Sequence, residues 1–339
     1  TVLQMRDALR LILGDLLELF SELTHLASAY RDTVMPGRSF QQHAAPITFG
    51  HKVAVWIDEL LRHHTRLVEM QPRVLVVQFG GAVGTLAPLG NTGLQVRREL
   101  ALELDLHEPR VTWHTARDTW AEVLSWLGML SATLGKIATE VSLLMRSEVD
   151  EVREPYGPGR GSSSAMPQKR NPILCEPMIA IAQRMREMVA SQLAAMIQDH
   201  ERGIGPMHLE WMIIPEAFIL TSASLNHAKT LLGGLVVDNE RMRRNLDASG
   251  RLIMAEAVMV GLARAVGRTR ALELVREISD QVRARGITLR EALLMDPRVL
   301  EVLDETQIDA LLDPTNYTGV AGPMVDDVVA RANALLAQS

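Results

Sequence analysis

Apolar residues recur at steps of three and four along most of this chain. The first 33 residues show the pattern clearly, with Met5, Leu9, Ile12 and Leu16 on one face of a helix. The same period predicts further helices over residues 48–70, 95–104, 119–145, 172–199 and 211–235.

The helix after residue 171 has two possible starting points. Asn171 is a good N-cap, and Pro172 is a good first helical residue. Pro177 would remove a backbone hydrogen bond if it lay inside the helix. The regular helix therefore begins either at Pro172 or near Pro177.

The helices become shorter and more charged after Val237, and we place a domain boundary there. No segment shows the sustained alternation of a strand. The sequence predicts an all-α fold, with a bundle of five long helices over residues 1–237 and a small helical domain over residues 238–339. The apolar faces are too broad for one thin bundle to bury, so we expect self-association.

The composition argues against several classes of function. The 339 residues carry a formal net charge of −6, which gives no reason to expect nucleic-acid binding. The single cysteine, Cys175, cannot form an internal disulfide and suits a reducing cytoplasm. No apolar run reaches the length of a membrane span. Without metal-ligand spacing, a Walker loop or a dinucleotide fingerprint, we expect a cytoplasmic protein with no cofactor and no bound metal.

Residues 157–172 interrupt the helical pattern with the sequence G-P-G-R-G-S-S-S-A-M-P-Q-K-R-N-P. Glycine and proline clusters of this kind mark connections between regular elements. On composition alone, a solvated serine-rich linker is the simplest interpretation. The order of the residues favours a functional interpretation, because serines, cations and an asparagine together form a dense set of hydrogen-bond donors.

Residues 163–172 resemble the signature of the fumarase/aspartase superfamily, G-S-S-x-M-P-x-K-x-N-P, with Ser162 at the position that usually holds glycine. Within the superfamily the chain is similar to the bacterial 3-carboxy-cis,cis-muconate cycloisomerases along its whole length. The supporting stretches are residues 37–46, 77–87, 113–118, 200–211 and 250–258. The resemblance implies a homotetramer whose long helices form a shared central bundle, with each active site built by loops from three subunits.

The superfamily makes or breaks a bond β to a carboxylate, and the resemblance implies roles in that chemistry. The acid/base serine corresponds to Ser163. Lys169 and Asn171 would hold the substrate carboxylate, on which negative charge builds. Many relatives also use a glutamate that corresponds to Glu176, paired with a catalytic histidine from the loop at residues 37–46.

The position of that histidine is Phe40 in this chain. Phenylalanine cannot transfer a proton, so an amine or hydroxide leaving group could not be protonated from this position. The cycloisomerase branch also has an aromatic residue there. Its reaction needs no acid for a leaving group, because the nucleophile is a carboxylate of the substrate itself.

The substrate implied by the resemblance is a small tricarboxylate, and several residues could bind it. Arg117 could instead form a structural ion pair with the neighbouring Asp118. His43 and His114 receive no role from the sequence. The substrate-binding residues implied by the resemblance are Arg38, Gln42, Thr85, Arg117, Met166, Arg202 and Trp211.

Two other functions remain open. Adenylosuccinate lyase has a phosphate-binding arginine at the position of Trp211 and a glutamine at the position of Trp113, so both residues disfavour that activity. The two tryptophans could equally be core residues. A catalytically silent member of the superfamily is the third possibility, and the intact Ser163, Lys169 and Asn171 argue against it.

The first motif of the superfamily, a T-S-x-D segment, lies in relatives just upstream of the helix that begins here at Thr1. We expect that segment to precede Thr1. Because it forms one wall of the site, we expect residues 1–339 alone to have little activity.

Overall fold

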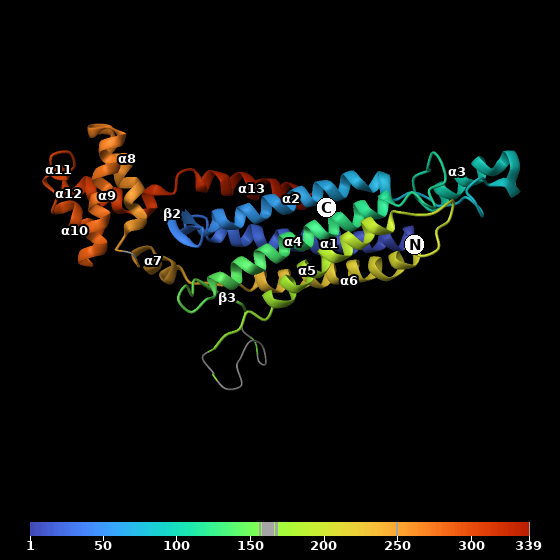
Figure 1. Ribbon diagram of the computed structural model, residues 1–339, viewed down its shortest axis with the longest axis horizontal. Coiled ribbons are helices and arrows are strands. Elements are labelled where there is room, and N and C mark those ends of the chain that lie inside the picture. The colour runs from blue at the N-terminus through green and yellow to red at the C-terminus, as the bar shows by residue number, and fades with distance from the viewer. Residues whose placement is uncertain (156, 158–165, 167–168, 249, 339) are drawn as a thin grey trace.

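The computed structural model describes residues 1–155, 157, 166, 169–248 and 250–338 (Figure 1). In this part of the chain, five long helices lie side by side in an elongated bundle. This arrangement confirms the predicted all-α class. The helices are α1 (Val2–Ala29), α2 (Phe49–Val74), α4 (Asp118–Leu144), α5 (Cys175–Ala195) and α6 (Pro206–Gly233).

Helix α4 lies at the centre of the bundle core, in contact with α2, α5 and α6. Among the described helices it alone is long and apolar enough to cross a membrane, contrary to the expectation that no segment reaches that length. Its most apolar window is 61% buried inside the bundle, as a core helix requires. The packing on α5 is close, because a Cβ atom at Gly135 would lie 2.5 Å from Cβ of Ala182.

Several helix boundaries differ from the predicted ones, among them the end of α2 at Val74 and the start of α6 at Pro206. Helix α1 ends at Ala29, before the predicted end at residue 33. Helix α5 begins at Cys175, between the two starting points inferred from the sequence, and it ends at Ala195. Pro177 therefore lies in the first turn, where a backbone N–H has no intrahelical partner and its loss costs little.

An antiparallel hairpin connects α1 to α2, so the prediction of an irregular loop was wrong here. Strand β1 (Val34–Ser39) pairs with β2 (Gln42–Thr48), and the register shifts by one residue between Pro36 and Arg38. A Cβ atom at Gly37 would lie 2.5 Å from the carbonyl oxygen of Ala45, so the close approach of the strands requires glycine at this position.

The turn of the hairpin consists of Phe40 and Gln41. Their φ angles are 50° and 63°, which is the left-handed region. Two-residue hairpin turns of this shape favour asparagine and glycine, and side chains of other residues are strained there. The turn places the side chain of Phe40 entirely in solvent, with an exposed fraction of 100%.

Short elements extend from both ends of the bundle. The 3-10 helix η1 (Ala87–Thr92) and helix α3 (Gly93–Glu103) project beyond one end (Figure 1). Towards the opposite end, strand β3 (Val152–Arg153) pairs with β4 (Val236–Val237). This pairing joins the segment that follows α4 to the segment that follows α6.

The buried residues group into two cores. The second core gathers residues from Leu246 to Leu312. The last helix, α13 (Ala321–Leu336), runs back along α1 and α2, and its Val325 and Ala332 belong to the bundle core (Figure 1). The boundary near Val237 stays a prediction. The elements between β4 and α13 are α7 (Asn239–Asp247), η2 (Leu252–Met254), α8 (Ala255–Val266), α9 (Arg268–Arg285), α10 (Leu289–Leu294), α11 (Pro297–Leu300), α12 (Glu305–Leu312) and η3 (Pro314–Tyr317).

Candidate active site

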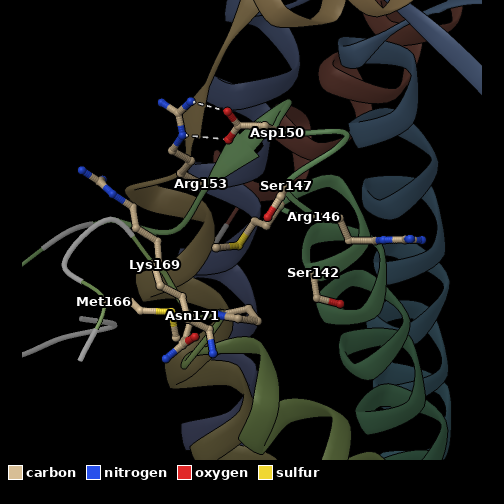
Figure 2. A pocket seen from close by; sticks show the side chains of 11 residues that line it. Ser142, Arg146, Ser147, Asp150, Arg153, Met166, Lys169 and Asn171 are labelled. Carbon is tan, nitrogen blue, oxygen red and sulfur yellow. Dashed lines mark hydrogen bonds and ion pairs between the residues drawn. The ribbon is translucent and has the colours of Figure 1, made fainter. Parts of the chain in front are cut away.

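Five described residues of the signature segment, from Met166 to Pro172, line one cavity of about 810 Å³. Met166, Lys169 and Asn171 form one wall, and Figure 2 shows Asp150 and Arg153 facing each other at the other end. Ser163 lies outside the described residues. The complete lining is Ser142, Met145, Arg146, Ser147, Asp150, Arg153, Met166, Lys169, Arg170, Asn171 and Pro172.

Positive charge dominates this cavity. Arg146, Arg153, Lys169 and Arg170 carry four cationic groups, whereas Asp150 is the one carboxylate in the lining. The Arg153 guanidinium donates to Asp150 at 3.0 and 2.9 Å, which neutralises that carboxylate. The side chain of Arg146 points away from the signature residues and pairs with Glu148 (Figure 2). Lys169 lies on the side of the cavity that the signature residues form, where a cationic group suits an anionic substrate.

A second group of predicted residues lines a smaller cavity of about 270 Å³, which also includes Thr1 and Met207. Arg117, Arg202 and Trp211 are in its lining. Trp211 is 60% exposed and meets the His208 ring edge to face, so it is not a core residue.

Trp113 is a core residue. Its indole Nε1 donates to the carbonyl oxygen of Val77 at 3.0 Å, and its side chain is buried.

Arg117 forms a buried ion pair, but not with its neighbour Asp118. Its Nε donates to the Glu210 carboxylate at 3.0 and 2.9 Å, and Nη2 contacts the same group. The Glu210 side chain is fully buried and also accepts from Gln192 at 2.8 Å. A buried carboxylate with these partners holds the guanidinium in a fixed orientation at the cavity wall.

His114 connects two residues of the same cavity. Its Nδ1 lies 2.7 Å from Nε2 of Gln78, and its Nε2 lies 3.1 Å from Nη2 of Arg202. Arg202 also donates to the carbonyl oxygen of Gly81 at 3.2 Å. His114, which had no role from the sequence, therefore orients Arg202 against residues 78–93, a glycine-rich segment.

A third group of residues singled out in the sequence lies on the hairpin of β1 and β2. Arg38 donates to both oxygens of the buried Glu151, and Gln42 is exposed beside the turn. His43 lies opposite Arg38 in the hairpin register, and partial desolvation together with the positive charge of Arg38 holds the pKa of His43 below its usual value. Arg38 also lines a cavity of about 450 Å³ with Lys52 and other residues.

Three described residues of the predicted site, Gln42, Thr85 and Glu176, lie outside the linings of these cavities. Thr85 is exposed in a bend of the glycine-rich segment, and Glu176 is exposed in the first turn of α5. Within one chain, the described members of the predicted site therefore form separate groups along the bundle and do not line one common cavity.

Sequence reasoning missed three buried carboxylates, Glu151, Glu154 and Glu210. Glu151 accepts from Arg38 and Glu210 accepts from Arg117, two residues of the predicted site. Glu154 accepts from Leu174, at the start of a predicted helix. Glu151 and Glu154 lie in the connection after α4 and Glu210 lies near the start of α6, and nothing in the surrounding sequence distinguishes them from exposed glutamates.

Comparison with known proteins defines the class of this protein. A family model described as Lyase matches residues 1–186, and a model described as Adenylosuccinate lyase C-terminus matches residues 251–328. With the long-helix bundle and the signature segment, these matches show that the chain belongs to the fumarase/aspartase superfamily of lyases.

Individual proteins of this superfamily are similar to the chain over almost its whole length. The 3-carboxy-cis,cis-muconate cycloisomerase of Pseudomonas aeruginosa is 45% identical over 334 residues, which cover 98% of this chain and 73% of that protein. Trans-aconitate decarboxylase 1 of Mycosarcoma maydis is 42% identical, over 98% of this chain and 67% of its own length. The crystal structure of the 3-carboxy-cis,cis-muconate lactonizing enzyme from Pseudomonas putida matches with a TM-score of 0.92 and 41% identity, over 98% of this chain and 74% of that one.

Proposed function

We propose that this protein is a cycloisomerase that closes 3-carboxy-cis,cis-muconate to a carboxymuconolactone in the catabolism of aromatic acids. One observation carries the proposal: Lys169 and Asn171 of the signature line a cavity whose charged groups are mostly cationic. A trianionic substrate needs such surroundings. The 45% identity to the Pseudomonas aeruginosa cycloisomerase supports the same substrate class.

The reaction would proceed by addition of one substrate carboxylate across a carbon–carbon double bond. A C–O bond forms at the carbon β to a second carboxylate, and the electron pair of the double bond moves towards the α carbon. Ser163 delivers a proton to that α carbon, which forms the new C–H bond. Lys169 and Asn171 bind the carboxylate on which charge builds during the addition, so their interactions strengthen in the transition state.

Phe40 favours ring closure over elimination. Its ring is fully exposed at the tip of the hairpin and offers no proton to a leaving group. Lactone closure has no leaving group, because all atoms of the substrate remain in the product. An elimination of an amine would need an acid that this tip does not carry.

We further propose a cytoplasmic homotetramer with active sites shared between subunits. Lys169 and Asn171 line a different cavity of one chain from Arg117, Arg202 and Trp211, so a complete site needs more than one copy. Large apolar side chains are also exposed on the bundle helices, which is the surface expected for an obligate assembly. These residues include Val68, Met129, Leu193 and Ile219.

A substrate panel tests the proposed activity. The full-length protein is incubated with 3-carboxy-cis,cis-muconate, trans-aconitate and adenylosuccinate at equal concentration, and products are separated by chromatography. We expect lactone formation with kcat/KM at least about 100-fold above the other two reactions, because the site must match one transition state. Preferential release of carbon dioxide from trans-aconitate, or of fumarate from adenylosuccinate, would reject the proposal.

A further inference from the structure

The carboxylate of Glu154 lies at the N-terminus of α5 and accepts hydrogen bonds from two of its backbone amides. The amide of Leu174 lies 3.0 Å from both carboxylate oxygens, and the amide of Cys175 lies 3.0 Å from Oε1. Only 7% of Glu154 is exposed. A glutamate at this depth is uncommon unless specific partners satisfy it.

These contacts replace an ordinary helix cap. The N-cap residue, Leu174, has no side-chain acceptor, and Asn171, the N-cap predicted from the sequence, precedes the helix. The first amides of a helix have no intrahelical acceptor, and a carboxylate there also interacts favourably with the helix dipole. Glu154 therefore supplies from outside the helix what its own first residues lack.

Cys175 adds a third partner. Burial, followed by a hydrogen bond to Glu154, raises the pKa of the Cys175 thiol, so the thiol remains protonated. The thiol, which is fully buried, can therefore donate to the same carboxylate.

The backbone of Glu154 is itself held in place. Glu154 directly follows β3, which pairs with β4, and the amide of Asp238 donates to the carbonyl oxygen of Glu151 at 3.0 Å. Glu154 directly precedes residues 155–173, and Leu174 directly follows them. One buried carboxylate thus joins the two ends of the segment that carries the signature.

We propose that Glu154 is a positioning residue, which fixes the end of the signature segment so that Lys169 and Asn171 remain at the wall of the cationic cavity. This inference rests on the proposed function, because it gives these two residues their task. Glu154 lies outside the cavity lining and acts through Leu174 and Cys175. A small displacement of groups that bind a reacting carboxylate reduces the rate steeply.

The first test measures amide hydrogen exchange in the full-length, assembled protein without substrate. In Glu154→Ala, the amides of Leu174 and Cys175 should exchange about tenfold faster or more, because they lose their acceptor. Glu154→Gln keeps one oxygen that can accept from both amides, so its exchange should remain within about threefold of wild type. Asp304→Ala is the matched control, since Asp304 caps α12 in the second core by accepting from Gln307.

The second test is a double-mutant cycle on kcat/KM with Glu154→Ala, Lys169→Met and the combined variant. If Glu154 acts by placing Lys169, the combined loss should be no more than about threefold larger than the larger single loss. We expect Glu154→Ala alone to lose about 10- to 100-fold, and Glu154→Gln to recover most of it. Asp304→Ala should retain the activity of wild type at a temperature where both are folded.

The outcomes separate this inference from the proposed function. Unchanged exchange at Leu174 and Cys175 in Glu154→Ala would overturn the inference, and so would single losses that multiply in the combined variant. If wild type does not convert carboxymuconate, the proposed function fails. The cycle is then run on whichever panel substrate the protein converts, and it judges the role of Glu154 by the same criteria.

Discussion

Arg38 and Glu151 form a two-point ion pair that ties the hairpin to the segment before β3. Nη1 and Nη2 of Arg38 donate to the two carboxylate oxygens at 2.9 and 2.7 Å. The Glu151 side chain is fully buried and also accepts from Asn245 at 2.8 Å. The pair therefore connects the hairpin, the β3 segment and α7 at one point.

We predict that Glu151→Ala lowers the free energy of unfolding by about 1–3 kcal/mol, because it leaves a partly buried guanidinium without its carboxylate and removes one of two acceptors from the buried Asn245 amide. Urea unfolding followed by circular dichroism measures the change. In Arg38→Met/Glu151→Ala the loss should be smaller than the sum of the losses in Arg38→Met and Glu151→Ala. As a control, Asp58→Ala breaks the exposed i,i+4 pair with Arg62 and should cost less than about 1 kcal/mol.

The same variants decide what Arg38 does. In this account Arg38→Met loses stability while the KM of the folded protein changes little. A large rise in KM at unchanged stability would assign Arg38 to the substrate instead.

The hairpin shows why part of the fold was not predictable. Pro36, Gly37 and Pro46 read as loop residues, yet they lie within paired strands. The turn residues Phe40 and Gln41 have left-handed φ angles without the asparagine or glycine that normally marks such a turn. Helix periodicity is a local signal and located the long helices, whereas the hairpin depends on pairing and on the close fit at Gly37.

The site shows a similar division. The signature segment was recognisable as an ordered string, and its described members Met166, Lys169 and Asn171 do line one cavity. The partners that hold Arg38 and Arg117 are Glu151 and Glu210, far from them in sequence. Such pairs depend on which distant segments the fold brings together, so the local sequence pattern does not predict them.

His63 should make stability depend on pH. It is buried against Thr133 with Nε2 at 2.9 Å from the hydroxyl oxygen, and burial, followed by the charge of Arg66, lowers its pKa from 6.5 to about 4. A histidine with a lowered pKa takes up its proton on unfolding. The contribution of His63 to the free energy of unfolding is therefore fully present above pH 6.5 and is lost as pH falls towards 4.

We therefore expect His63→Asn to flatten the dependence of unfolding free energy on pH between about 6.5 and 4, by up to about 1.4 kcal/mol per pH unit. Urea unfolding at intervals of pH measures the slope. His25→Asn, at an exposed position on α1, is the control and should keep the slope of wild type. An unaltered slope in His63→Asn would contradict the neutral, buried state of His63.

Phe40→His alone should not create adenylosuccinate cleavage. The variant restores a proton donor at the hairpin tip, but Trp211 still stands where a phosphate-binding guanidinium would be needed. Fumarate release from adenylosuccinate is the measurement, with Phe40→His/Trp211→Arg as the comparison. Cleavage by the single variant at a rate equal to the double variant would refute this account of specificity.

The most direct test of the central claim is turnover of 3-carboxy-cis,cis-muconate in D₂O, followed by proton NMR for wild type, Ser163→Ala and the control Ser162→Ala. The account predicts that wild type forms a lactone with one deuterium at the carbon α to a carboxylate. It predicts that Ser163→Ala slows this reaction at least about 100-fold, the scale expected for loss of a positioned acid, while Ser162→Ala keeps most of the rate. Lactone formation by Ser163→Ala at the wild-type rate would show that the signature serine does not deliver the proton.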